Sequence, residues 1–428
     1  MIKKIKSIRG MNDLLPIDIN LWQKIENIIK NLIISYGYNE IRLPIIEKTI
    51  LFEKTIGNQT DIIKKEMFSF NDRNMKNISL RPEATIGCVR SGIEHNFIYN
   101  KEQRLWYIGP MFRYERPQKG RYRQFNQIGI EVFGLKGPQI DAEIILITYR
   151  LWKILGLSNY ITLEINTIGS IKTRIKYNNI LKKFFIKNIN ILDLENIKKI
   201  YKNPIRILET KNIKIKKIIN KAPCITKYLS MKSKIHFYQL CKILKKIGVK
   251  YNINKSIVRG LDYYNYTVFE WITKNVNFNI TICGGGRYDK LIEQLGGNKT
   301  SAIGCAIGLE RLILLIKKIQ DISKYKFKID INIISFNNFN IKFNSIKLIE
   351  YIHNKLPKLK ILNNYNNLNI KKQLINSNNI FTTLVIIIGD NEIYNKILII
   401  KNINNKIQLM LPINEIIFFL KIFFKKKL

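Results

Sequence analysis

The sequence predicts an α+β domain in which an antiparallel sheet is flanked by helices, with a helical insertion and a smaller C-terminal α/β domain. Two long strand-like segments in the first half are joined by turn residues, which is typical of an antiparallel hairpin. Residues from about 172 to 250 are rich in Lys, Ile and Asn, poor in Gly and helical in pattern. After about residue 325, strand-like and helix-like segments alternate. We therefore place the two domains at residues 1–325 and 326–428.

The first domain is expected to begin with a helix and to continue in extended segments. Apolar residues recur at helical spacing over Asp18–Tyr36, and Gly37 ends the helix. The extended segments that follow are Glu40–Glu47, Leu105–Glu115 and Arg123–Gly134. The turn residues between the last two predict an antiparallel hairpin with a long loop.

Strand-like segments resume after the helical insertion. They are Ser256–Trp271 and Thr281–Gly297, and a helix is expected from about Ile307. In the second domain we predict two strands and two helices, namely strands Ile329–Phe336 and Leu384–Gly389 and helices Ser345–Leu356 and Asn414–Lys425.

The composition indicates a folded protein with a strong positive charge. Hydrophobic residues make up 46% of the 428-residue chain, which is enough to build the cores of two or three domains. The formal net charge of +42 favours a polyanionic partner such as nucleic acid. The chain is also saturated with Ile, Lys and Asn, as AT-rich coding would produce, and many lysines then form only a solvated surface. Charge alone therefore leaves RNA binding open.

The cysteines and histidines show no metal-ligand spacing. The five cysteines are scattered without a Cys-x-x-Cys pair, and there are only three histidines. We therefore expect no structural metal held by the protein, and a reduced, cytosolic compartment. The basic start MIKKIKSIRG is not followed by an apolar signal core, and the longest apolar stretches are too short to span a bilayer. We expect a soluble cytoplasmic protein that does not associate with membranes.

The segment Arg123–Gly134 carries polar side chains in an unusual setting. Alternate residues of a strand share a face, so Gln127 and Glu131 lie on one face between aromatic residues, and the opposite face is mostly apolar. Buried polar groups need partners. The two side chains form either an internal hydrogen-bond network or the wall of a pocket for a small polar molecule. This segment alone does not decide between the two.

Arginines are concentrated in the preceding strand and in the hairpin loop. Arg113 and Glu115 share a face, and the loop adds Arg116, Arg121 and Arg123. Guanidinium groups bind phosphate in a bidentate manner, although a surface salt-bridge cluster around Glu115 would explain the same residues. A Cys/His nucleophile pair is absent from these segments, so we favour phosphoryl or nucleotidyl chemistry driven by positioning and charge stabilisation.

Two glycine-containing segments complete the set of candidates. The run Gly284–Asp289 allows the backbone to approach a ligand closely. Gly304, Gly308, Glu310 and Arg311 are expected at the start of a helix, where anions are favoured. Tight packing would explain the glycines equally well.

Taken together and in order, these segments resemble the class II aminoacyl-tRNA synthetases, and specifically the histidyl-tRNA synthetase family of the bacterial type. The segments that carry the resemblance are motif 1 at Tyr36–Glu47, motif 2 at Phe112–Gly134, motif 3 at Gly304–Arg311, RGLDYY at Arg259–Tyr264, GGGRYD at Gly284–Asp289, IRGMNDLLP at Ile8–Pro16 and SLRPEAT at Ser79–Thr85.

The resemblance implies a role for each matching residue. Its implied histidine site consists of Glu83, Thr85 and Gln127 around the α-amino group, Glu131 and Tyr264 around the imidazole, and the neighbouring Tyr263. Its implied ATP site consists of Arg113 and Arg259 on opposite sides of the α-phosphate as the catalytic pair, Arg121 and Arg311 on the outer phosphates, and Phe125 stacked on adenine. Arg9 and Arg116 are implied to meet the acceptor end of the tRNA.

The implied activity is that of a histidine–tRNA ligase. Histidine and ATP with Mg²⁺ would give histidyl-adenylate and pyrophosphate, and histidine would then pass to the 3′ end of tRNA(His). A homodimer is implied, with a C-terminal anticodon-binding domain from about residue 326. The alternatives are a non-catalytic paralogue that regulates histidine biosynthesis by binding histidine, and a basic RNA-binding protein that kept the fold. Such paralogues usually lack the C-terminal domain and active-site residues, and RNA binding alone does not need Arg113, Arg259 and Arg311.

Overall fold

The chain forms two compact units. The computed structural model describes residues 4–57, 60, 62–99, 101–210, 212–276, 279–325, 327–336, 338–365, 369–425 and 427. The first unit comprises the residues up to Leu15 together with Trp22–Asp321, and the second comprises Pro16–Leu21 and the residues from Ile322 onward. Within the described residues, no helix is long and apolar enough to cross a bilayer.

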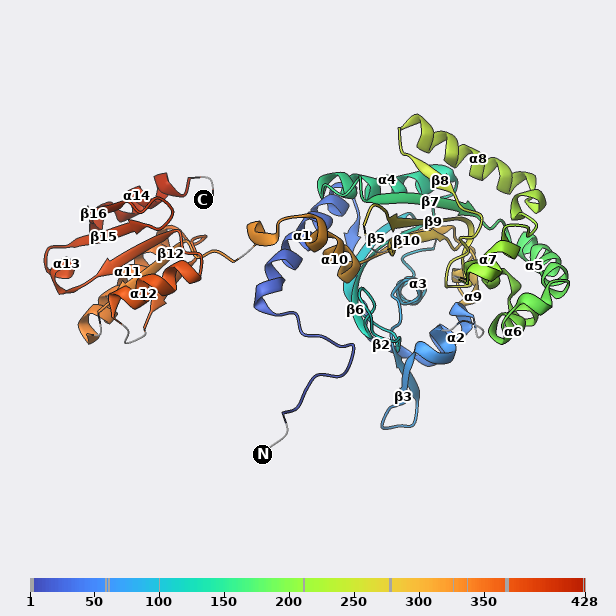
Figure 1. Ribbon diagram of the computed structural model, residues 1–428, viewed down its shortest axis with the longest axis horizontal. Helices are drawn as coiled ribbons and strands as arrows, with labels where there is room; N and C mark the ends of the chain where they lie inside the picture. The colour runs from blue at the N-terminus through green and yellow to red at the C-terminus, as the bar shows by residue number, and fades with distance from the viewer. Residues whose placement is uncertain are drawn as a thin grey trace. The chain divides into compact units, whose positions relative to one another are not determined.

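An eight-stranded, largely antiparallel sheet organises the first unit (Figure 1). Its strands, in spatial order, are β1 (Asn39–Glu40), β5 (Gln103–Phe112), β6 (Gln124–Phe133), β11 (Ala302–Gly308), β10 (Thr281–Arg287), β9 (Asn265–Thr273), β7 (Ile161–Thr167) and β8 (Tyr251–Ile253). Among the described strands of this sheet, only the edge pairs β1–β5 and β7–β8 are parallel. The antiparallel hairpin predicted around residues 105–134 is confirmed as β5–β6, in which Leu105 faces Glu131.

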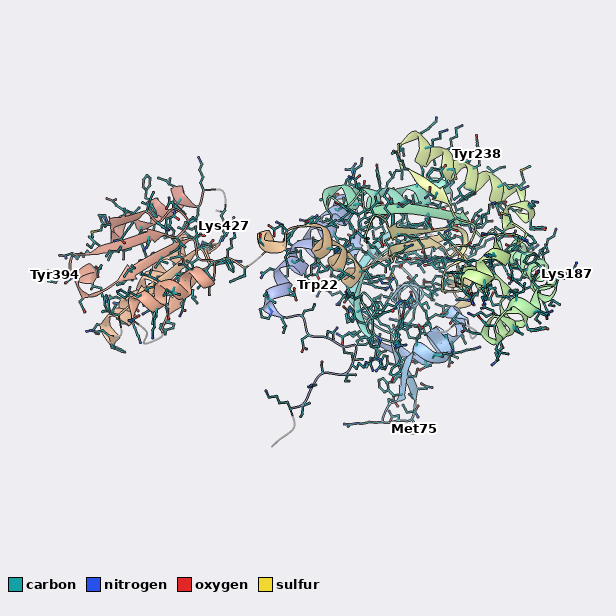
Figure 2. The ribbon with its side chains drawn as sticks, viewed as in Figure 1. Trp22, Met75, Lys187, Tyr238, Tyr394 and Lys427 are labelled. Carbon is teal, nitrogen blue, oxygen red and sulfur yellow. The ribbon has the colours of Figure 1, made fainter. Side chains whose placement is uncertain are left out.

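A smaller sheet and several helices surround the large sheet. The small antiparallel sheet consists of β2 (Ile46–Lys48), β4 (Asn77–Leu80) and β3 (Phe68–Asn71). The helices outside the insertion are α1 (Pro16–Ser35), α2 (Thr49–Ile56), the π-helix η1 (Ile62–Glu66), α3 (Thr85–Glu94), α4 (Pro138–Ile154), α9 (Leu291–Gln294) and α10 (Leu309–Ile319). Met75, 75% exposed, marks the tip of the β3–β4 hairpin (Figure 2).

Helices α3 and α4 lie on opposite faces of the large sheet (Figure 1). The packing of α4 is fixed by side chains of β9. Trp271 of β9 donates its indole N–H to the Thr148 hydroxyl of α4 at 2.8 Å and meets Trp152 edge to face. The face covered by α3 retains a cavity.

The predicted helical insertion is present between β7 and β8. Its segments are α5 (Ile171–Ile186), η2 (Ile189–Ile191), α6 (Leu194–Lys202), η3 (Pro204–Glu209), α7 (Ile213–Ile219), η4 (Ile225–Tyr228) and α8 (Met231–Lys246). Lys187 and Tyr238 mark its outer surface (Figure 2). Its apolar side chains, such as Leu181 and Ile207, belong to the same buried cluster as Tyr263 of the RGLDYY segment and Val258 just before it. The insertion therefore shares a core with the sheet domain.

The second unit is a five-stranded mixed sheet with helices. Its elements are η5 (Ile322–Tyr325), β12 (Ile331–Ser335), α11 (Phe339–Lys355), β13 (Ile361–Asn364), α12 (Ile370–Asn379), β14 (Leu384–Ile388), α13 (Asp390–Tyr394), β15 (Ile397–Asn402), β16 (Gln408–Pro412), η6 (Ile413–Glu415) and α14 (Ile416–Phe423). The strand order is β13-β12-β14-β15-β16, with β12 parallel to both of its neighbours. The alternation of strands and helices predicted from the sequence is therefore confirmed.

Two local expectations were wrong. Gly304–Gly308 is strand β11 and not the start of a helix, which begins only at Leu309. Residues 256–264 form an irregular loop that is held by side chains, and the expected strand starts at Asn265. The extended segment Glu40–Glu47, by contrast, is divided between two sheets, which its two ends join, and the residues between them are irregular.

The centre of the large sheet should dominate the stability of the first unit. Ile130 of β6 is fully buried, whereas Ile154 of α4 is 53% exposed. We expect Ile130→Ala to lower the free energy of unfolding by about 2–5 kcal/mol, since it leaves a cavity in a packed core. The control Ile154→Ala should change it by at most about 0.5 kcal/mol. Denaturant unfolding followed by tryptophan fluorescence measures both, and equal shifts would contradict this description of the core.

Candidate active site

A cavity opens on the α3 face of the large sheet and gathers most of the predicted site residues. The predicted residues that line it are Glu83, Thr85, Arg113, Arg121, Phe125, Gln127, Arg259, Tyr263, Tyr264 and Arg311. Glu131, Arg9 and Arg116 are the predicted residues that do not line it. The strands β6, β10 and β11 form its floor, and the hairpin loop and the RGLDYY segment contribute to its walls.

Glu131 lies one layer beneath the cavity wall and is 1% exposed. Its carboxylate accepts hydrogen bonds from Thr85 Oγ1 at 2.7 Å and from the Tyr107 hydroxyl at 3.2 Å. The Tyr288 hydroxyl donates a further short hydrogen bond. Thr85, Tyr107 and Tyr288 themselves line the cavity. The strand pattern left open whether Glu131 belongs to an internal hydrogen-bond network or to a pocket wall. Both descriptions apply, because the hydrogen-bond network forms the back of the pocket.

Burial controls the protonation of this carboxyl group. The pKa of Glu131 is raised to about 8, because burial disfavours the charged form more than the hydrogen bonds favour it. The nearby Glu83 carboxylate adds to the rise. Burial therefore shifts Glu131 toward its neutral form near neutral pH.

Glu83 combines a structural role with a place on the cavity wall. Its carboxylate accepts the backbone N–H groups of Thr85 and Ile86, both at 2.9 Å, and so caps the start of α3. Burial raises the pKa of Glu83 despite these bonds. In the cavity, the Tyr263 hydroxyl also donates a hydrogen bond to the Glu83 carboxylate, at 3.4 Å. One end of the cavity therefore presents carboxyl groups and tyrosine hydroxyls.

The other end of the cavity is cationic. Arg311 is held by the backbone carbonyls of Gly120 and Thr281, each at 2.9 Å. The pKa of Arg311 is lowered, first by burial and then by the positive charges of Arg121 and Arg113. Three guanidinium groups thus lie close enough to repel one another, and an anion placed among them would relieve that repulsion. The Arg113 guanidinium also lies over the Phe125 ring, 5.3 Å from its centroid.

Arg259 occupies the wall of the cavity in a strained backbone conformation. Its φ of +78° lies in the left-handed region, which is unfavourable for a residue with a Cβ atom. Its guanidinium forms an ion pair with Glu270 of β9 and lies 5.7 Å from the centroid of the Tyr264 ring. Burial disfavours the charged form of Arg259, but the negative charge of Glu270 favours it more strongly. The pKa of Arg259 is therefore raised above the usual arginine value. Strain of this kind is common where a fold positions a functional side chain.

Glycines in the floor make room for these side chains. A Cβ atom on Gly129 would overlap the Tyr107 ring, and one on Gly284 would overlap the Arg259 guanidinium. A Cβ atom on Gly304 would overlap the Glu131 carboxylate. The side chains therefore lie flat against the sheet, in space that larger residues at these three positions would fill.

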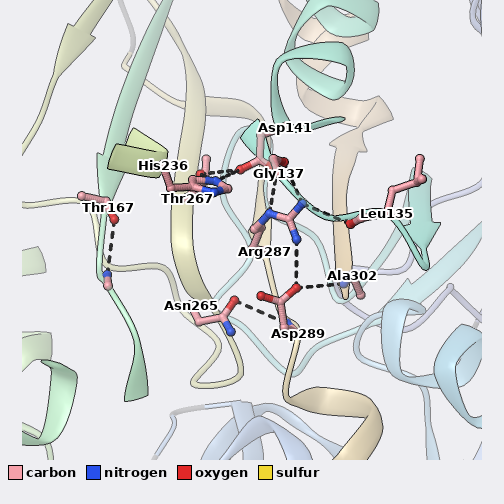
Figure 3. Close-up of polar contacts among 11 residues, drawn as sticks. Leu135, Gly137, Asp141, Thr167, His236, Asn265, Thr267, Arg287, Asp289 and Ala302 are labelled. Carbon is pink, nitrogen blue, oxygen red and sulfur yellow. Dashed lines mark hydrogen bonds and ion pairs between the residues drawn. The ribbon is translucent and has the colours of Figure 1, made fainter. Parts of the chain in front are cut away.

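The opposite face of β10 anchors the GGGRYD segment (Figure 3). Asp141 of α4 is fully buried and accepts hydrogen bonds from Arg287 Nε at 2.7 Å and Thr267 Oγ1 at 2.5 Å. His236 of the insertion lies 2.8 Å from the same carboxylate. Arg287 also donates to Asp289 at 2.9 Å. Because these bonds hold Arg287 and Asp289 on this face, the intervening Tyr288 lies toward the cavity, where its hydroxyl donates to Glu131.

The two arginines implied in tRNA contacts lie outside the cavity on adjoining segments. Arg9 and Arg116 are both exposed. Gly10 accepts the backbone N–H of Arg123 at 2.8 Å, and a Cβ atom on Gly10 would touch Pro117. The N-terminal segment therefore packs against the hairpin loop, which brings the residues next to Gly10 and Pro117 onto one surface.

Several residues of the site were not predicted from the sequence. Tyr107 and Tyr288 bind Glu131, and Glu270 pairs with Arg259; of these, Tyr288 lies in the predicted segment Gly284–Asp289, which assigned it no role. The strand alternation that revealed Glu131 could have placed Tyr107, since Tyr107 lies opposite Gly129 on the paired strand. Among the described residues, no group of three or more His, Cys, Asp or Glu side chains could hold a metal ion.

The raised pKa of Glu131 predicts a pH-dependent stability. Between about pH 4.5 and about 8 the folded state binds more protons than the unfolded state, so stability falls as pH rises through this window. Glu131→Gln removes this dependence. We expect its melting temperature, relative to that of the parent protein, to rise between about pH 5 and about pH 9. The exposed Glu350→Gln is the control, and a constant difference across the range for Glu131→Gln would contradict the assignment.

The chain is similar to proteins of known family over most of its length. Residues 10–312 match the family model described as histidyl-tRNA synthetase. The histidine–tRNA ligase of Buchnera aphidicola subsp. Schizaphis graminum is 55% identical over 361 residues, which is 84% of this chain and 84% of the relative. That of Blochmanniella pennsylvanica is 53% identical over 361 residues, or 84% of this chain and 82% of the relative.

A solved structure agrees with these sequence matches. The crystal structure of apo histidyl-tRNA synthetase from S. aureus has a TM-score of 0.81 and 32% identity, and covers 98% of this chain and 100% of that chain. The predicted class II fold is thereby confirmed. With a family match over residues 10–312 and relatives more than half identical, the chain belongs to the histidyl-tRNA synthetase family.

Proposed function

We propose that this protein is a histidine–tRNA ligase that activates histidine with ATP and then transfers it to the 3′ end of tRNA(His). The observation that carries the proposal is the division of one cavity into an end with buried carboxyl groups and an end with clustered arginines. Such a cavity suits an amino acid with a basic side chain placed against a polyphosphate.

The catalytic function is favoured over a regulatory paralogue and over simple RNA binding. The two curated relatives described above are named histidine–tRNA ligase and align with 84% of this chain. The cavity also gathers the four arginines implied in phosphate binding, Arg113, Arg121, Arg259 and Arg311. Binding histidine or RNA alone would not require four cations around one cavity.

At the carboxyl end of the cavity, we assign histidine recognition to the residues implied by the resemblance. Glu83, Thr85 and Gln127 hold the α-ammonium group, and Tyr263 and Tyr264 enclose the side chain. Glu131 receives the imidazole through a rearrangement of its hydrogen bonds to Thr85, Tyr107 or Tyr288. An analogue that cannot hydrogen-bond would leave the buried Glu131 without its ligand partner, so specificity needs no separate editing step.

At the cationic end, Arg113 and Arg259 hold the α-phosphate while Arg121 and Arg311 hold the outer phosphates. A carboxylate oxygen of histidine attacks the α-phosphorus, and the bond from phosphorus to the bridging oxygen of pyrophosphate breaks. Negative charge accumulates on the α-phosphate oxygens in the transition state, where fixed guanidinium groups stabilise it. Phe125 provides the ring on which adenine stacks.

Magnesium is proposed to arrive as part of the ATP complex. Mg²⁺ is usually bound by one or two protein carboxylates together with substrate phosphates. Glu115 and Glu270 provide carboxylates on the cavity wall. The ion would neutralise phosphate charge beside the arginines.

The second step requires tRNA, and its contacts are assigned by resemblance. The terminal ribose hydroxyl attacks the histidyl carbonyl carbon, and AMP leaves. Arg9 and Arg116, exposed on adjoining segments, suit the phosphates of the acceptor end. The domain from about residue 326 is assigned to the anticodon, and the cytoplasm is the proposed compartment.

A homodimer is part of the proposal. Apolar side chains are exposed at the end of motif 1 and just beyond it, where Ile45, Ile46 and Ile50 are 42%, 46% and 49% exposed. Exposed isoleucines close together in the sequence are consistent with a surface that a second subunit covers.

Histidine-dependent ATP–pyrophosphate exchange tests the proposed function. We expect exchange with histidine and with no other amino acid, and charging of tRNA(His) under the same conditions. Arg259→Ala should lower the exchange rate by roughly 10²-fold or more, because it removes a cation that acts on the transition state. Arg73→Ala, on the exposed β3–β4 hairpin, is the matched control and should leave the rate unchanged. Histidine binding without exchange in the parent protein would instead support the regulatory paralogue.

A further inference from the structure

The loop that carries Arg259 has no secondary structure of its own. Residues 256–264 are irregular, yet the loop places Arg259, Tyr263 and Tyr264 on the cavity wall. Its backbone also holds Arg259 in a left-handed conformation that the residue does not favour by itself. Contacts from outside the loop must therefore fix this arrangement.

These contacts come from two arginines of the helical insertion. Arg174 of α5 donates to the backbone carbonyls of Asp262 and Tyr264, both at 2.8 Å. Arg206 of η3 donates to the Gly260 carbonyl at 3.0 Å. The carbonyls of Gly260, Asp262 and Tyr264 are thus bound by guanidinium groups that lie more than 50 positions away in the sequence.

An ion pair adds to the backbone contacts. Arg206 Nη2 lies 2.7 Å from Asp262 Oδ1, and the two side chains are only 12% and 24% exposed. Asn203, immediately before η3, donates to the same carboxylate at 3.2 Å. On its other side, Asp262 packs against Gly57, where a Cβ atom would overlap the carboxylate. The loop is therefore held between the insertion and the residue that follows α2.

We propose that Arg174 and Arg206 are positioning residues through which the helical insertion holds the Arg259 loop in its catalytic conformation. The proposal rests on the proposed function, since the activity that it affects is histidine activation. Neither arginine lines the cavity, so both act through Arg259 and its neighbours and not on the substrate. Loss of these contacts would allow the strained residue 259 to relax, and its guanidinium would leave the α-phosphate position.

The test compares variants of the full-length protein in histidine-dependent ATP–pyrophosphate exchange. Arg206→Ala should lower kcat at saturating substrates by roughly tenfold or more, because a misplaced catalytic group loses its orientation. Arg206→Lys keeps the charge and should recover part of this loss. Lys199→Gln, which breaks a surface ion pair with Glu195 in the same insertion, is the matched control and should change kcat by no more than roughly twofold.

A double-mutant cycle separates positioning from a general effect on the fold. If Arg206 acts through Arg259, Arg206→Ala should cause no further loss of single-turnover adenylate formation in an Arg259→Ala background. Losses that multiply in the two backgrounds, or a parent-like kcat for Arg206→Ala, would overturn the proposal. If Arg206→Ala does not fold, Asp262→Asn takes its place, since it weakens the ion pair and keeps the backbone contacts.

Failure of the proposed function and failure of the positioning role give different results in this experiment. A parent protein without exchange would contradict the ligase function itself. An active parent protein with an equally active Arg206→Ala variant would contradict only the role of the insertion.

Discussion

The close approach of functional side chains to the floor of the large sheet is the constraint on which the site depends. Tyr107, Glu131 and Arg259 occupy space that the missing side chains of Gly129, Gly304 and Gly284 would otherwise fill. Because these glycines lie on three neighbouring strands, the sheet itself becomes the wall of the cavity. The side chains that would bind the substrates are then positioned by rigid backbone. They need little reorganisation when charge develops during the reaction.

This floor is held in register by contacts on both of its sides. On the α4 face, the buried pair of Asp141 and Arg287 fixes the end of β10, and a buried ion pair of this kind is costly to break by removing one partner. On the cavity face, the neighbouring Tyr288 donates a hydrogen bond to Glu131 and so fixes the position of its carboxylate. The insertion reaches both regions, through His236 at Asp141 and through Arg206 at Asp262. One helical module therefore supports the histidine end and the phosphate end of the cavity.

Local patterns in the sequence predicted the parts of the structure that depend on local rules. Strand alternation placed Glu131 on a polar face, and turn residues predicted the β5–β6 hairpin. The Asp141–Arg287 pair joins residues 146 positions apart, which no periodicity reveals. Glycines such as Gly304 and Gly308 suit both a helix entry and a strand that must be flat, and only the partner Glu131 distinguishes the two at Gly304. Residues 256–264 have a strand-like sequence, but their conformation is held by arginines distant in the sequence, which no local pattern reveals.

The binding of histidine and ATP to a Gly304→Ala variant tests the role of the glycine floor most directly. A methyl group at this position would overlap the Glu131 carboxylate and the backbone carbonyl of Ile130, both on β6. Isothermal titration calorimetry should show histidine affinity reduced by roughly tenfold or more, since a buried hydrogen-bonding group is misplaced. ATP affinity should stay within roughly threefold of the parent value, because sites without shared partners respond independently. Unchanged histidine affinity, or equal losses for both ligands, would contradict the account.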